Sequence, residues 1–128
     1  MKKLLIFIIL IISISGFAQE VQNDSIYSIS EVDKKPEFNG GVSKFNRFIV
    51  SNFRCGEQRK FYGKIITEFV IEKDGSLSNF KTINDFGFGS GAEAIRVLKL
   101  SPNWIPAEKN GKIVRSIYIF PLEINKSK

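Results

Sequence analysis

The sequence predicts one small α+β domain, and three observations support this class. Segments 43–53 and 90–100 carry apolar residues at helical spacing. Two strand-like segments flank Asp74-Gly75, a dipeptide typical of β-hairpin turns. A final segment, 112–124, alternates apolar and polar side chains as a strand does. Helices combined with an antiparallel hairpin in one short chain indicate an α+β domain.

The N-terminus has the composition of a secretory signal peptide. Lys2 and Lys3 precede an apolar run, 4–12, and small residues follow up to Ala18. We therefore expect residues 1–18 to be removed by cleavage after Ala18, with the remaining chain in the periplasm as one domain. The alternative is an uncleaved anchor in the inner membrane, although a spanning helix needs about 20 apolar residues.

Composition excludes several function classes. The formal net charge is +6, but the basic residues are scattered, so we expect a solvated surface and no nucleic-acid partner. Cys55 is the single cysteine, which excludes a disulfide within the chain. The chain has no histidine, so the common histidine-based catalytic and zinc sites are excluded. We expect no catalytic residue, metal or cofactor; Glu68 and Glu72 could form a glycosidase pair, but they lie on the solvent face of a predicted strand.

The segment after the signal, 19–34, is expected to be flexible, although 26–32 alternates as a short strand would. The folded domain is expected over 35–125. Its first helix, 43–53, places four apolar side chains on one stripe, which predicts core packing; a ligand-binding aromatic box is the alternative. The stripe consists of Phe45, Phe48, Ile49 and Phe53.

A β-hairpin is predicted next. Segment 63–72 reads as a half-buried strand with Ile65, Phe69 and Ile71 on one face. Asp74 and Gly75 would be the central residues of a two-residue type I′ turn, because that turn needs positive φ at both positions. The turn would lead into a second strand over 77–84.

The second helix has a clear start and stop. Ser90 and Glu93 have the spacing of a capping box, and Pro102 prevents continuation beyond about Leu100. Three glycines at 87, 89 and 91 suggest a phosphate cradle as an alternative, but no Gly-Lys-Ser/Thr follows them.

Trp104 lies between Pro102 and Pro106 on a stiff extended segment. We interpret it as a plug that closes the core beneath the helix, since a large apolar ring is more often buried than displayed. The alternative is a recognition anchor, because a rigid aromatic side chain loses little entropy on binding.

The final strand follows a turn at Asn110-Gly111. Its apolar face consists of Tyr118, Phe120, Leu122 and Ile124. Pro121 cannot donate to a ladder and therefore predicts an edge strand. Such an edge could pair with a foreign peptide by strand addition, or with a second copy in a homodimer. The alternative is that Pro121 and Arg115 protect the edge against pairing.

The order of these segments resembles one family, the C-terminal domain of TonB, across about residues 31–123. TonB couples an inner-membrane motor to outer-membrane transporters. The matching pieces are 35–41, 63–65, 69–75, 93–97, the Pro-x-Trp-x-Pro segment 102–106, 110–112, 114–115 and 118–121. The resemblance implies a small antiparallel sheet of about three strands packed on two helices, and an edge strand that meets the TonB box of a transporter.

From this resemblance we expect a non-enzymatic periplasmic domain that binds TonB-box-like segments of an outer-membrane TonB-dependent transporter or another envelope protein. The expected contact residues are Arg115, Ser116, Ile117, Tyr118 and Ile119. The expected structural residues are Asp74, Gly75, Ser90, Glu93, Trp104 and Pro106.

The chain departs from the family pattern at Asn39 and at 54–56, and it carries no long proline-rich spacer. Two alternatives therefore stand beside the expected function: a short anchored energy transducer, and an envelope-binding module unrelated to transport.

Overall fold

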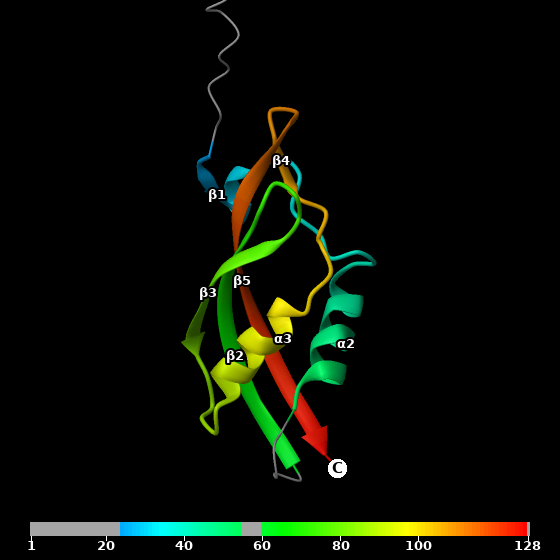
Figure 1. The fold of residues 1–128 in the computed structure, drawn as a ribbon, viewed down its shortest axis with the longest axis vertical. Helices are drawn as coiled ribbons and strands as arrows, with labels where there is room; N and C mark the ends of the chain where they lie inside the picture. The colour runs from blue at the N-terminus through cyan, green and yellow to red at the C-terminus, as the bar shows by residue number, and fades with distance from the viewer. Residues whose placement is uncertain (1–23, 55–59, 128) are drawn as a thin grey trace, which may run out of the picture.

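The computed structural model describes residues 24–54 and 60–127, so the predicted signal peptide and Cys55 lie outside the described residues. Figure 1 shows the order of the elements along the chain. They are β1 (Ile26–Ser28), the short 3-10 helix η2 (Ile29–Glu31), α2 (Val42–Asn52), β2 (Lys60–Ile71), β3 (Leu77–Asn84), α3 (Ser90–Lys99), β4 (Ala107–Lys109) and β5 (Lys112–Ser127).

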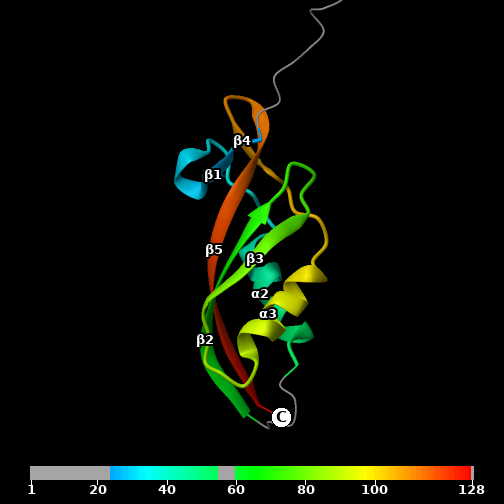
Figure 2. The ribbon, with the colours of Figure 1, turned by 60° about the vertical axis from the view of Figure 1, so that its left-hand side comes forward.

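The strands form one mixed sheet in the order β1-β5-β2-β3, and β4 pairs with the start of β5. β5 runs antiparallel to β2 along residues 116–127, and β2 runs antiparallel to β3. β1 is parallel to β5. The sheet curls into a half-barrel, and both α-helices lie on the same side of it (Figure 2).

The expected sheet of about three antiparallel strands packed on two helices is therefore wrong. Strand accounts for 43% of the described residues, and the sheet has five strands. The difference comes from two three-residue strands, β1 and β4, which both pair with β5. The alternation over 26–32 indicated a short strand within the segment expected to be flexible, and β1 lies there. β4 carries too few residues for a recognisable alternation and was missed.

The hydrophobic core fills the space between the helices and the concave face of the sheet. The aromatic stripe of the first helix packs into this core as predicted, with Phe45, Ile49 and Phe53 at 1% exposure each. The predicted apolar face of the last strand is also confirmed, because Phe120, Leu122 and Ile124 are buried and Tyr118 packs against them.

Trp104 is the predicted plug. Its side chain is 4% exposed, and its ring centroid lies 4.8 Å from that of Phe45 and 5.5 Å from that of Tyr118. Its indole nitrogen donates a hydrogen bond to Ser101 Oγ (3.0 Å), so the one polar atom of the ring is satisfied. Pro106 lies between Ile105, which forms a bridge with Glu37, and the start of β4 at Ala107.

The β2–β3 hairpin exists, but its turn differs from the prediction. Glu72 N–H donates to Ser76 O (2.8 Å) and Gly75 N–H donates to Glu72 O (2.9 Å), which makes a three-residue loop. Only Gly75 has positive φ (88°) in this loop, as in a type I turn followed by a glycine bulge. Asp74 accepts hydrogen bonds from the backbone N–H and hydroxyl of Ser76, so it stabilises the turn from outside.

The predicted capping box at the start of α3 is wrong. Ser90 is already the first helical residue, and Gly89 stands at the N-cap. The Ser90 hydroxyl instead accepts the Phe86 N–H (3.2 Å). Glu93 accepts the Arg54 N–H (2.7 Å) and pairs with Arg96 (2.6 Å), so it joins α3 to the end of α2. The helix starts one residue earlier than a capping box at these positions requires.

Candidate functional site

The candidate site is the side of β5 that faces away from β2. β1 lies on this side and pairs with residues 115–117, while β2 occupies the other side along 116–127. Within the described part of the chain, residues 118–127 pair with β2 alone. We call the unpaired side of this stretch the open edge.

The five expected contact residues thus fall into two groups. Arg115, Ser116 and Ile117 lie beside β1, and only Tyr118 and Ile119 belong to the open edge. The prediction of a simple edge strand is wrong for the first group. Sequence reasoning could not see this, because nothing in the pattern of 26–28 tells which strand it joins.

The side chains of this stretch point to different environments. Ser116 is fully buried, and its hydroxyl has no hydrogen-bond partner. Tyr118 stacks on Phe69, with ring centroids 5.6 Å apart and an interplanar angle of 18°, and partial burial raises the pKa of its hydroxyl. Ile119 is 53% exposed. A foreign chain could therefore reach the side chain of Ile119 but not that of Ser116.

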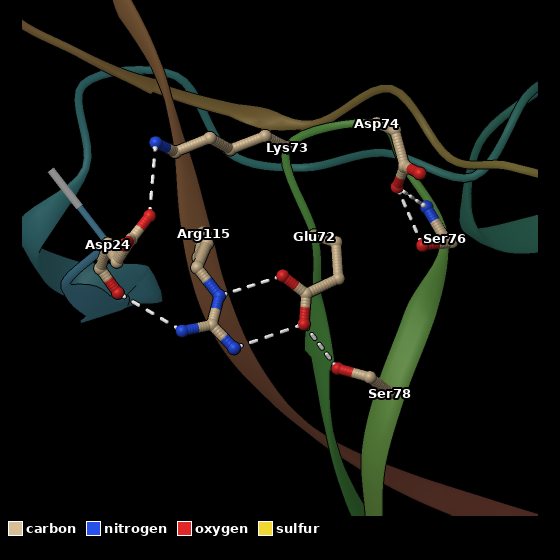
Figure 3. Close-up of polar contacts among 7 residues, drawn as sticks. All are labelled: Asp24, Glu72, Lys73, Asp74, Ser76, Ser78 and Arg115. Carbon is tan, nitrogen blue, oxygen red and sulfur yellow. Dashed lines mark hydrogen bonds and ion pairs between the residues drawn. The ribbon is translucent and has the colours of Figure 1, made fainter. Parts of the chain in front are cut away.

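Arg115 is engaged within the protein (Figure 3). Its Nε donates to Glu72 Oε1 (2.7 Å) and its Nη2 donates to Glu72 Oε2 (3.1 Å). Its Nη1 donates to the carbonyl oxygen of Asp24 (3.0 Å), which lies two residues before β1. These hydrogen bonds hold the pKa of the Glu72 carboxyl below its usual range. Arg115 therefore links β5, the end of β2 and the approach to β1.

Two further contacts complete this cluster. Ser78 donates its hydroxyl proton to Glu72 Oε2, and Lys73 lies 3.8 Å from the Asp24 carboxylate. The cluster surrounds a wide, open depression beside the β2–β3 turn. Each charged group of the cluster has a partner within it, so we assign the cluster a structural role.

Pro121 lies on the open edge. The carbonyl oxygen of Phe120 accepts a hydrogen bond from Thr67 Oγ of β2, so residue 120 turns its backbone polar groups toward β2. Polar groups of successive residues point to alternate sides of a strand. Pro121 therefore faces the open edge, where it supplies no N–H, and it divides this edge into 118–120 and 122–127.

A small pocket adjoins Tyr118, the first residue of the open edge. Its volume is about 130 Å³, which suits one side chain and is too small for a cofactor. Trp104 forms part of its lining, and the loop before α2 and the start of α2 supply most of the rest. The other lining residues are Pro36, Glu37, Phe38, Gly41, Val42 and Phe45.

The alternative sites considered from sequence are not assembled. The backbone N–H of Gly87 donates to the chain's own Asp85 carboxylate (2.9 Å), so the glycine-rich loop before α3 already holds an anionic group. Glu72 is bound by Arg115, which leaves no free carboxylate pair with Glu68. In residues 24–54 and 60–127, no group of three metal-ligating side chains converges. The same residues include no helix with the length and hydrophobicity to cross a membrane.

Comparisons with protein families, with characterised proteins and with solved structures gave no significant match to this chain.

Proposed function

We propose that this protein is a non-enzymatic interaction domain of the periplasm that binds an extended peptide segment by strand addition to β5. The observation that carries the proposal is the open edge itself, which stands beside a pocket of the size of one side chain. Strand addition needs both features, because backbone pairing provides affinity and pockets for alternate side chains provide specificity.

The backbone directions along β5 support one arrangement of the peptide. Ile119, Glu123 and Asn125 turn their backbone polar groups to the open edge by the same alternation that places Pro121 there. Every second side chain of the peptide would then point to the helix side of the sheet, where the pocket next to Tyr118 offers a place for an apolar group. A residue opposite Pro121 would find an acceptor but no donor.

The proposed partner is a TonB-box-like segment of an outer-membrane transporter. Its identity rests on the sequence resemblance to the TonB C-terminal domain. The open edge supports the mode of binding, and it would serve a segment of another envelope protein equally well.

An NMR titration tests the proposal. The isotopically labelled full chain, purified from the envelope fraction, is titrated with synthetic peptides that cover the periplasmic N-terminal segments of outer-membrane transporters from the same organism. We expect saturable shifts within 115–125. The variant Ile119→Pro should lose them because it lacks the N–H, whereas Ile119→Thr, which changes the side chain and keeps the N–H, should retain them. If no peptide shifts these resonances, the proposed transport partner is wrong.

A further inference from the structure

The chain's own β1 lies on the side of β5 that the proposed partner would use. Ile26, Tyr27 and Ser28 pair with Arg115, Ser116 and Ile117 in parallel register. These are three of the five residues that the sequence resemblance assigns to partner contact. β1 and a peptide on the open edge would therefore lie along the same side of β5, one after the other.

β1 is a short strand that is partly exposed. It has only three residues, and Ile26 is 39% exposed. Besides backbone pairing, Lys109 lies 5.5 Å from the Tyr27 ring and donates to Glu31 O (2.8 Å), while Arg115 bonds the Asp24 carbonyl. The ion pair of Lys73 with Asp24 is exposed and contributes little. Short segments with few buried contacts open locally at low free energy, long before the molecule unfolds.

Pro121 limits the length of the edge that is open while β1 is in place, so release of β1 lengthens it. With β1 in place, the open edge beside the pocket is only residues 118–120, because Pro121 interrupts it. Without β1, the uninterrupted edge extends over 115–120 and includes all five expected contact residues. The released edge therefore has the usual length of a strand in globular proteins, about five or six residues.

We infer, on the basis of the proposed function, that β1 is a resident strand that a full-length partner segment must displace from β5. The free chain is then partly self-inhibited. The apparent dissociation constant equals the intrinsic one divided by the fraction of molecules in which β1 is released. Binding therefore strengthens when β1 is loosened and weakens when β1 is fixed.

A reversible disulfide that fixes β1 tests this inference. Tyr27 and Ser116 are Cα partners in adjacent strands, a geometry that a disulfide accepts. The double variant Tyr27→Cys/Ser116→Cys is made in the full chain with Cys55, its one native cysteine, replaced by serine. The probe is the transporter peptide with the largest shifts in the titration above. We expect the oxidised protein to bind it about tenfold or more weakly than the same protein after reduction.

Controls separate the possible outcomes. The single variants Tyr27→Cys and Ser116→Cys should show no difference between oxidising and reducing conditions. Equal affinity of the oxidised and reduced double variant would overturn the inference, because β1 and the peptide would then bind side by side. If the reduced protein and the wild-type chain both fail to bind any peptide, the proposed function falls and the inference falls with it.

A second measurement needs no ligand. In native-state hydrogen exchange of the full chain, we expect the amides of Ile26–Ser28 to exchange through local opening, well before those of the β2–β5 ladder. Exchange of β1 only together with global unfolding would overturn the inference, even if peptides bind.

Discussion

Two buried serines differ in what their hydroxyl groups contact. Ser116 and Ser90 are both at most 1% exposed, but Ser90 accepts a backbone N–H whereas Ser116 Oγ has no partner. A buried polar group without a partner loses its hydration and gains nothing in return.

This difference predicts opposite effects of the same substitution. Ser116→Ala should stabilise the domain by about 1 kcal/mol, because it removes an unsatisfied hydroxyl. Ser90→Ala should destabilise it by about the same amount, because it removes the hydroxyl that accepts the Phe86 N–H. Urea denaturation of both variants measures the two free energies of unfolding. Equal effects would mean that the Ser116 hydroxyl has a partner after all.

Glu72 makes stability depend on pH. Hydrogen bonds from Arg115 lower its pKa in the folded state, so its contribution is fully present above the unfolded pKa of about 4.3 and is lost as pH falls through the folded value. We expect the wild-type chain to be more stable than Glu72→Gln at pH 7, and this difference to shrink below about pH 4. Thermal unfolding of both proteins between pH 7 and pH 2.5 measures it. A difference that does not change with pH would contradict the assignment.

At the scale of elements, the β2–β3 turn docks on the segment that carries the tryptophan. Trp104 N–H donates to Gly75 O (2.8 Å), and Asn103 donates to Asp74 O (3.2 Å). A Cβ on Gly75 would lie 2.0 Å from the carbonyl oxygen of Trp104. Gly75 is therefore required for the close approach as well as for its positive φ.

Gly111 provides the matched comparison. It also has positive φ (76°), but a Cβ there would meet no atom within 4 Å. Gly111→Ala should therefore cost only the backbone strain of about 1–2 kcal/mol. We expect Gly75→Ala to cost at least about 2 kcal/mol more, because the turn must move away from Trp104. Similar losses in denaturation experiments would show that the turn separates from this segment at little cost.

The two helices and the strands β2, β3 and β5 were predictable from sequence close to their observed bounds, whereas β4 and local irregularities were not. The helical stripe with Phe45 and the alternation in β5 identified the core correctly. In β3, Asn79 has positive φ (51°) within an irregular part of the register, and Ile83 beyond it is 48% exposed. No residue pattern announces such an irregularity, because it depends on the neighbouring strand.

At the scale of the whole molecule, an open strand edge raises the question of self-association. An antiparallel pair of β5 edges related by a two-fold axis would contain Pro121 twice, and each proline would remove a donor from the ladder. An open edge on the final strand was thus predictable from Pro121. Its limits were not, because β1 comes from the far end of the chain.

We therefore expect that the chain does not dimerise through this edge. Restoring the backbone N–H at position 121 should favour a dimer. We expect sedimentation velocity to show a monomer for the wild-type chain at about 100 μM and a concentration-dependent dimer for Pro121→Ile, since edge protection by proline is lost. A control, Pro102→Ala, changes a proline outside the sheet and should stay monomeric. A wild-type dimer would mean that a different surface associates.

β5 pairs with three other strands, because β1, β2 and β4 each align with it in a separate register. A one-residue insertion within it would shift every side chain beyond that point to the opposite face and break several registers together. Natural variation in the length of this protein should therefore fall in the connections, such as 85–89 between β3 and α3, while the length of β5 stays constant.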